Sequence, residues 1–158
     1  MHARVKVAAL ALGAALSLSA CSLAASITTS NAYDPSDGIG IELGDVSTEN
    51  FLLISGGAGE PAALVGTLYN EGDEPARVSV TIGGDSTEIV VAPHTLVTLG
   101  VGEDEQEFIT TSPVAAGGIA EVSVQLEGIA PVSSPIPVLD GTLEEYREVL
   151  DALDGAAN

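Results

Sequence analysis

The chain of 158 residues has one cysteine, Cys21, and the residues before it suggest that its thiol is chemically modified. A basic start that includes Arg4 and Lys6 precedes an apolar run from Val7 to Leu16, and small residues then lead to Cys21. This order is typical of a secretory signal peptide. The apolar run is about ten residues long, which is shorter than the roughly 17–25 residues of a membrane-spanning helix. The sequence therefore predicts an exported protein with its cysteine at the end of the signal.

The segment Leu18-Ser19-Ala20-Cys21 resembles the lipobox of bacterial lipoproteins. In that family the cysteine thiol receives a diacylglyceryl group through a thioether, and the signal is cut just before the cysteine. The resemblance implies cleavage between Ala20 and Cys21 and lipid attachment, palmitate included, on Cys21. Two or more acyl chains hold a protein stably on a membrane without a spanning helix. A buried structural cysteine is the alternative.

Two further features have the residue types of a reactive site, and the sequence favours a structural role for both. His94, beside Pro93 in a turn pattern, could activate a serine, but no Gly-x-Ser-x-Gly segment presents one. The glycine-rich segment 56–59 follows an expected strand, but it lacks the lysine of a P-loop and a following helix. We expect an exposed turn histidine and a hairpin loop.

Acidic residues gather in two clusters whose oxygens could bind calcium. The dense cluster is Glu103, Asp104, Glu105 and Glu107, and the looser one is Asp34, Asp37, Glu42 and Asp45. Neither has the spacing of an EF-hand, and a solvated acidic loop is the alternative.

Paired carboxylates can also hydrolyse glycosides, but the chain has no tryptophan for a sugar platform. We expect no enzyme activity, no metal site and no cofactor.

The strong negative charge of the chain argues against some classes of binding partner. After Cys21 the chain has all 23 of its acidic residues and two arginines, Arg77 and Arg147, which gives a formal charge of −21. Such a surface repels nucleic acid and anionic lipid headgroups. The apolar fraction of 46% indicates that this acidic chain nevertheless folds.

The chain divides into four parts. Residues 1–20 are the lipoprotein signal peptide, 21–32 the lipidated cysteine and a flexible linker, 33–141 a β-domain, and 142–158 a C-terminal helix and tail. Residues 22–32 are mostly small and polar, and about eleven such residues span roughly 18 Å as a flexible coil. We expect the linker to hold the domain away from the membrane.

Short runs rich in Val, Ile, Thr and Leu predict an all-β domain. Two runs, Arg77–Ile82 and Glu121–Glu127, alternate polar and apolar side chains with period two, which is the pattern of half-buried strands. The alternation predicts a core position for Val78, Val80, Ile82, Val122, Val124 and Leu126. Seven to nine strands without helices between them indicate an antiparallel β-sandwich. The expected strands are Ile39–Val46, Phe51–Ser55, Ala62–Asn70, Arg77–Ile82, Thr87–Ala92, Leu96–Val101, Glu107–Thr111, Glu121–Glu127 and Pro135–Leu139.

The C-terminal segment has a different period. Thr142 and Glu145 have the spacing of a capping box, which predicts a helix over Thr142–Asp154. An apolar stripe at helical spacing consists of Leu143, Tyr146, Leu150 and Leu153. The stripe either packs on the sandwich or contacts a partner through Tyr146 and Leu150.

The lipobox, Tyr33-Asp34-Pro35, the segment 64–73, the Val-Ala-Pro-His turn and the segment 137–142 together resemble a group of actinobacterial surface lipoproteins. Their domain is similar to the periplasmic copper chaperones called PCu(A)C. The resemblance implies an immunoglobulin- or cupredoxin-like sandwich over about residues 33–146. Those chaperones bind Cu(I) through histidines and methionines, whereas here Met1 leaves with the signal and His94 stands alone, so no ligand is carried over.

The leading hypothesis is a lipid-anchored, non-catalytic binding protein of the cell envelope, on the outer face of the cytoplasmic membrane. Its partners would be the membrane, through Cys21, and an envelope protein or a wall polymer. A metal-handling protein that has lost its soft ligands and a hydrolase that uses acidic residues are the alternatives.

Overall fold

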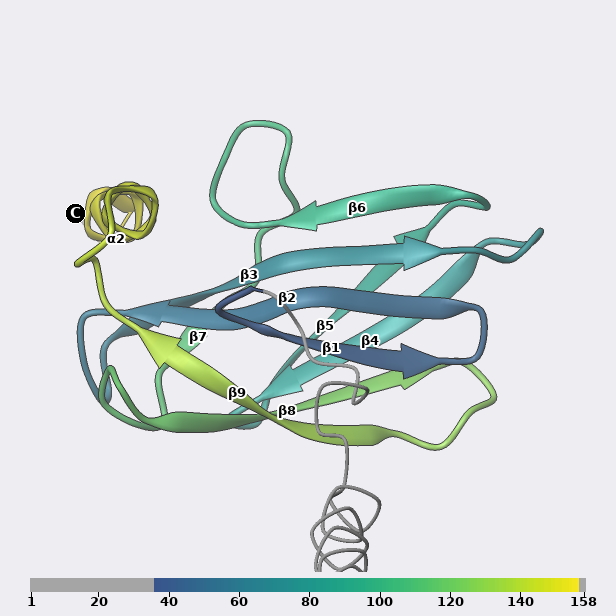
Figure 1. Ribbon diagram of the computed structural model, residues 1–158, viewed down its shortest axis with the longest axis horizontal. Coiled ribbons are helices and arrows are strands. Elements are labelled where there is room, and N and C mark those ends of the chain that lie inside the picture. The colour runs from purple at the N-terminus through teal and green to yellow at the C-terminus, as the bar shows by residue number, and fades with distance from the viewer. Residues whose placement is uncertain (1–35, 157–158) are drawn as a thin grey trace, which may run out of the picture. The chain divides into compact units, whose positions relative to one another are not determined.

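The computed structural model describes residues 36–156, and everything below refers to them. The signal peptide, Ala20, Cys21, the linker and Tyr33-Asp34-Pro35 lie outside the described residues. The domain is all-β with one C-terminal helix, as the sequence predicted (Figure 1). Its elements are β1 (Ile39–Leu43), β2 (Val46–Ser55), β3 (Pro61–Asn70), β4 (Ala76–Ile82), β5 (Asp85–Val91), β6 (Thr95–Leu99), β7 (Ile109–Thr111), β8 (Ile119–Leu126), β9 (Val132–Leu139) and α2 (Glu144–Ala156).

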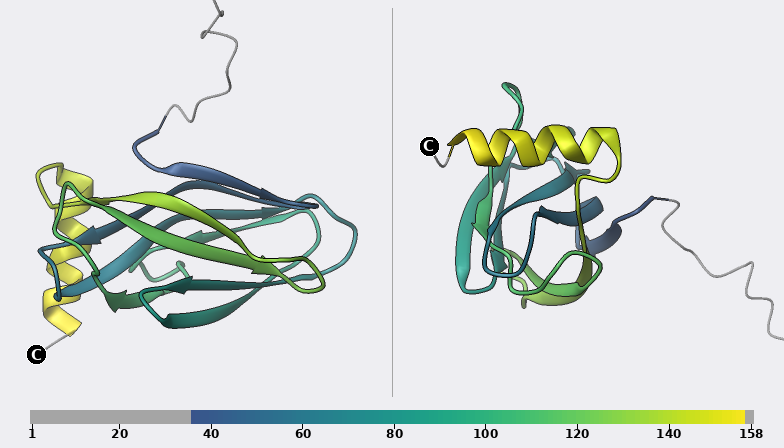
Figure 2. Two further views of the ribbon diagram at one scale, coloured as in Figure 1. Left: turned by 90° about the horizontal axis from the view of Figure 1, so that it is seen from below. Right: turned by 90° about the vertical axis from the view of Figure 1, so that its left-hand side faces the viewer.

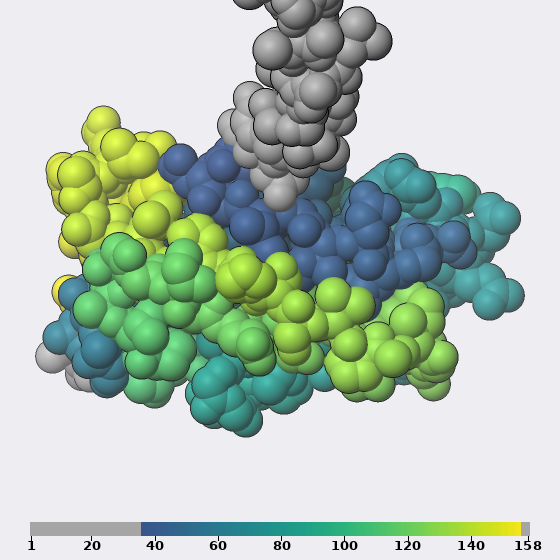
Figure 3. All heavy atoms as spheres, turned by 60° about the horizontal axis from the view of Figure 1, so that its bottom comes forward, coloured from purple at the N-terminus to yellow at the C-terminus, as the bar shows by residue number. Residues whose placement is uncertain are grey.

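The strands form one nearly closed sheet in the order β5-β4-β8-β9-β2-β3-β6, with β1 paired to β2 and β7 to β3. All pairs are antiparallel except β2–β9, which is parallel. The views from below and from the side show the strands folded over into two layers around a common core (Figure 2). On one face of the molecule β1 lies beside β9 (Figure 3).

The core contains the alternating residues that the sequence selected. Val78, Val80, Ile82, Val122 and Val124 are buried, and Leu126 packs against them half-buried. A period-two strand sends every second side chain to one face, so the alternation alone determines which side chains lie inside.

The first expected strand is wrong in its bounds, because residues 39–46 contain a hairpin. Gly44 adopts φ 61° and, with Asp45, connects β1 to β2, where Leu43 pairs with Val46. Residues 47–50, expected as a break, continue β2 through a bulge at Asn50 with φ 54°. A two-residue turn needs positive φ, which glycine adopts without steric cost.

The helix α2 covers the outer face of β2 and β3. Phe51 and Leu53 belong to the sandwich core, while Leu52 and Ile54, on the opposite face, are also fully buried. Helix α2 contacts β2 and β3, and its Leu153 is buried. The uninterrupted apolar run in β2 thus serves two layers, one on each face of the strand.

The helix begins two residues later than expected, at Glu144. Leu143 therefore precedes α2 and is 45% exposed. The turn before the helix is closed by Asp140, whose carboxylate accepts a hydrogen bond from the Thr142 N–H at 2.9 Å. Hydrogen bonding to the Thr142 side chain, together with this bond from its backbone N–H, lowers the pKa of Asp140 below the usual value of an aspartate.

Candidate functional site: an acidic hollow at the strand ends

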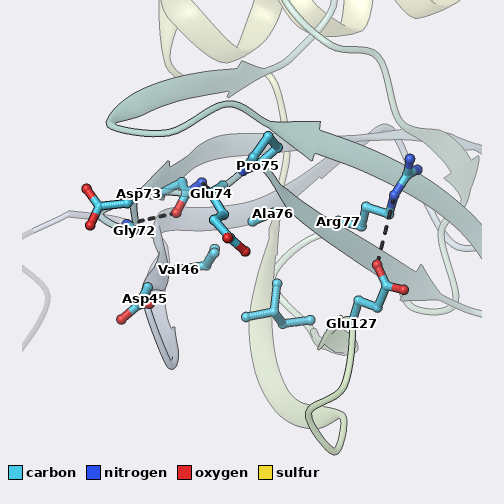
Figure 4. A pocket seen from close by; sticks show the side chains of 11 residues that line it. Asp45, Val46, Gly72, Asp73, Glu74, Pro75, Ala76, Arg77 and Glu127 are labelled. Atoms are coloured by element: carbon cyan, nitrogen blue, oxygen red, sulfur yellow. Dashed lines mark hydrogen bonds and ion pairs between the residues drawn. The ribbon is translucent and has the colours of Figure 1, made fainter.

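A hollow of about 550 Å³ opens where β3 ends and β4 begins, beside the start of β2 and the end of β8 (Figure 4). Its apolar part is formed by Val46, Pro75, Ala76 and Leu126. Around them stand four carboxylates and one guanidinium, from Asp45, Asp73, Glu74, Glu127 and Arg77. We call this set the acidic hollow.

The buried side chain of Asn70 holds the rim of the acidic hollow. Its Nδ2 donates hydrogen bonds to the carbonyl oxygens of Glu74 at 2.8 Å and Val91 at 3.0 Å. Its Oδ1 accepts one from the Gly72 N–H at 2.9 Å. One amide therefore satisfies backbone groups of the β3–β4 loop and of β5, which fixes the loop against the opposite layer.

A second link joins the loop to the β1–β2 hairpin. The Glu71 N–H donates to the Asp45 carbonyl at 2.8 Å. Gly72 lies so close to Asn70 and Asp45 that a Cβ there would be 3.1 Å from Asn70 Oδ1 and 3.2 Å from Asp45 Cβ. The tight approach explains a glycine at this position.

The one cation of the acidic hollow is already paired. Arg77 Nη1 lies 2.9 Å from Glu88 Oε1 and its Nε lies 3.9 Å from Glu127 Oε2, and all three side chains are more than half exposed. Such surface pairs contribute little to stability. The acidic hollow therefore keeps an excess of negative charge, which attracts cationic groups.

His94 is the exposed turn residue that the sequence predicted. It lies between β5 and β6 with φ 53°, and its Nε2 is 3.0 Å from Asp73 Oδ1 at the rim of the acidic hollow. Residues 56–59 lie in the loop between antiparallel β2 and β3, which makes them the expected hairpin loop.

The dense acidic cluster lies in the loop after β6. Glu103, Asp104, Glu105 and Glu107 are all exposed. Glu105 Oε2 accepts a hydrogen bond from the Gly102 N–H at 2.7 Å, so this carboxylate closes its own turn. Within residues 36–156, no three His, Cys, Asp or Glu side chains are grouped to hold a metal ion.

Tyr146 and Leu150, the predicted partner contacts, lie half-buried against the domain. Leu150 Cδ1 would be 2.9 Å from a Cβ on Gly141, and the Tyr146 hydroxyl donates to Asp37 Oδ2 at 2.8 Å. Burial, the hydrogen bond to Asp37 and the charges of Asp37 and Glu145 raise the pKa of Tyr146 to about 12. The stripe is thus largely used by the domain itself, and its contact with a partner stays a prediction.

Sequence reasoning missed the acidic hollow. Asp45 was assigned to another cluster, and Glu74, Arg77 and Glu127 were not singled out as a site, because the topology alone brings three separate segments together. The signal available was the polar segment Asn70-Glu71-Gly72-Asp73-Glu74-Pro75, an acidic loop between two strands.

No family model and no curated protein matches this chain. Among solved structures, the copper-bound PCuAC domain from PmoF2 matches with 19% sequence identity and a TM-score of 0.49. The match covers 65% of this chain and 98% of that domain. The matched domain is of the class that the sequence resemblance named. A likeness at this level concerns the fold and says nothing of what this chain binds.

The residues of the described domain do not fit Cu(I). Residues 36–156 contain no methionine and no cysteine, and their one histidine, His94, is hydrogen-bonded to Asp73. Soft thioether and thiolate donors are the ligands that Cu(I) prefers. Carboxylates and backbone oxygens, which the domain offers instead, suit hard cations.

Proposed function

We propose that this chain is a lipid-anchored, non-catalytic binding protein on the outer face of the cytoplasmic membrane. The observation that carries the proposal is the segment Leu18-Ser19-Ala20-Cys21 at the end of a signal-type stretch. The diacylglyceryl group on the Cys21 sulfur supplies the two acyl chains that stable anchoring needs.

The folded domain supplies the binding surface in this proposal. Its charge repels anionic headgroups, so the linker and the charge together hold it away from the bilayer. The negative charge of the acidic hollow favours a partner that presents cationic groups. An envelope protein with basic residues or a wall polymer with amines presents such groups. Within residues 36–156, no helix is long and apolar enough to cross a membrane.

The anchor is tested by Cys21→Ser with Ser22→Ala as the matched control. We expect Cys21→Ser to lose the acyl mass and to leave the membrane fraction, because the thioether needs the sulfur. Ser22→Ala should keep both. Intact-protein mass spectrometry and fractionation measure the outcome, and an unchanged mass and membrane fraction in Cys21→Ser would refute the anchor.

The binding role is tested by crosslinking in intact host cells. The expected result is a recurrent crosslinked partner whose association rate, measured with purified components, falls as salt rises. Turnover of a wall or lipid substrate by the purified protein would refute the non-catalytic role.

A further inference from the structure

The outer strand β5 leaves one row of backbone groups without a strand beside it. In the sheet order β5 is terminal, and within the described chain it pairs with β4 alone. The β4–β5 loop is Gly83-Gly84, with φ 60° and 101°, and Ile82 pairs with Asp85 across it. Positive φ at both central residues is typical of a two-residue hairpin turn, whose flanking residues are hydrogen-bonded to each other.

This turn determines which backbone groups are free. Hydrogen-bonded and non-hydrogen-bonded pairs alternate along an antiparallel ladder. Counted from the bonded pair Ile82–Asp85, the N–H and C=O groups that point away from β4 belong to Ser86, Glu88 and Val90. We call these groups the β5 edge.

The three residues that contribute the β5 edge are exposed. Ser86, Glu88 and Val90 are all exposed, and Val90 is 52% exposed although it is an aliphatic residue. The alternate residues Ile89 and Val91 are buried in the core. One face of β5 therefore packs on the core, and the side chains of the opposite face are exposed.

In the described domain, β6 and the part of β9 that does not pair with β2 carry protections that β5 lacks, whereas β1 is a shorter edge strand that also has no proline or lysine. On β6, Gln106 occupies the edge, since its N–H donates to the Thr98 carbonyl at 2.8 Å and its carbonyl accepts from Gly100. Strand β9 contains Pro135 and Pro137. Strand β5 has seven residues and neither proline nor lysine, the residues that commonly block an exposed edge.

Both ends of β5 are fixed to the opposite layer. The Thr110 hydroxyl donates to Asp85 Oδ2 at 2.7 Å, and Asn70 Nδ2 donates to the Val91 carbonyl at 3.0 Å. An edge held at both ends needs little ordering when a partner binds, which favours affinity.

Charge decides between a second copy and a different partner. Glu88 is the central residue of β5, so antiparallel pairing of two copies over the whole strand places Glu88 opposite Glu88. Like charges directly opposite each other destabilise a strand pair, and the residues after Cys21 give each copy a formal charge of −21 in that part of the chain. A strand with lysine or arginine opposite Glu88 gains instead, because the pair of Glu88 with Arg77 is solvent-exposed and weak.

We infer that the β5 edge binds an extended, basic segment of a partner protein as an added strand. The inference rests on the proposed binding function and names its surface and the chemistry of its partner. Strand addition takes its affinity from main-chain hydrogen bonds and its specificity from alternate side chains, here Ser86, Glu88 and Val90.

The test uses the full chain in its host cells, with a photoreactive residue at Ser86 or, for comparison, at Gln125. Gln125 is exposed on β8, which has a strand on each side. We expect a partner crosslinked through Ser86, with the crosslinked peptide mapped by mass spectrometry to a segment that contains lysine or arginine. A crosslink to a second copy of this chain, or to an acidic segment, would overturn the inference.

Two variants then examine the mode of binding. Val90→Pro removes an edge N–H and leaves the β4 ladder intact, and Val90→Thr is its control. We expect Val90→Pro to lower the Ser86 crosslink yield roughly tenfold, the effect of losing one hydrogen bond at the interface. Glu88→Lys should lower it similarly, whereas Glu121→Lys, the same charge change on exposed β8, should retain most of the yield. If Val90→Pro does not fold, the crosslink yield of Glu88→Lys alone tests whether the partner binds at the β5 edge.

The failures of the two proposals are distinguishable. Partners crosslinked through other positions, with a Ser86 yield that neither Val90→Pro nor Glu88→Lys changes, would refute the β5 edge and leave the binding function standing. The absence of a crosslinked partner at every position would refute both.

Discussion

Asn70 is the residue on which the shape of the acidic hollow depends most directly. It is 1% exposed, and its amide joins the β3–β4 loop to β5. A buried amide that hydrogen-bonds to several backbone groups is costly to remove, because its loss leaves those carbonyl and N–H groups without a partner.

We expect Asn70→Ala to lower the free energy of unfolding by about 2–3 kcal/mol. The control is Gln125→Ala, which removes an exposed amide and should change it by less than about 0.5 kcal/mol. Urea unfolding of the two variants measures both values. A loss of under about 0.5 kcal/mol in Asn70→Ala would mean that the loop holds its shape without the amide.

Val124 tests the core at the same scale. Val124→Ala deletes two methyl groups from a fully buried side chain and should destabilise the domain by about 1–3 kcal/mol. Val90→Ala, at an exposed strand position, is the matched control and should cost less. Equal midpoints of unfolding in the two variants would contradict the burial of Val124.

At the scale of elements, α2 is the one helix of the described domain, and one hydroxyl joins it to the segment before β1. The Tyr146 hydroxyl donates to Asp37, and the pKa of Tyr146 rises from 10.0 to about 12 in the folded domain. Because the folded pKa is the higher one, the neutral hydroxyl contributes stability that is fully present below pH 10 and is lost as the pH rises through 12.

We therefore expect alkaline loss of stability between pH 10 and about 12 that depends on Tyr146. The variant Tyr146→Phe keeps the ring and has no proton to lose, so its stability should change less over that range. Thermal unfolding at a series of pH values compares the two proteins. The same alkaline slope in both would show that another group controls it. Tyr69→Phe is the control for general tyrosine ionisation.

At the scale of the whole molecule, the donor atoms of the described domain argue against a role in binding Cu(I). Residues 36–156 contain no methionine and no cysteine, whose sulfur atoms are the soft ligands that Cu(I) prefers. We expect the mature protein to show no stoichiometric, tight uptake of Cu(I) in a competition titration, and no shift of its melting temperature on adding the ion. Tight uptake would favour the metal-handling alternative, and His94→Ala would then show whether the one histidine of the domain takes part.

The sequence by itself determined the β class, the helix at the C-terminus and the inward side chains, because these depend on local periodicity. Alternation in Arg77–Ile82 and Glu121–Glu127 selects the same face of each strand whatever its neighbours are. The hairpin at Gly44-Asp45 was missed because a strand pattern continues on both sides of it, and only the pairing of Leu43 with Val46 separates β1 from β2.

Only the tertiary structure decided which surfaces exist. The acidic hollow joins the β1–β2 hairpin, the β3–β4 loop and the end of β8, which lie far apart in the sequence. The order β5-β4-β8-β9-β2-β3-β6 makes β5 terminal, which its sequence alone does not show. Whether a strand lies at an edge depends on non-local pairing, which local periodicity does not encode.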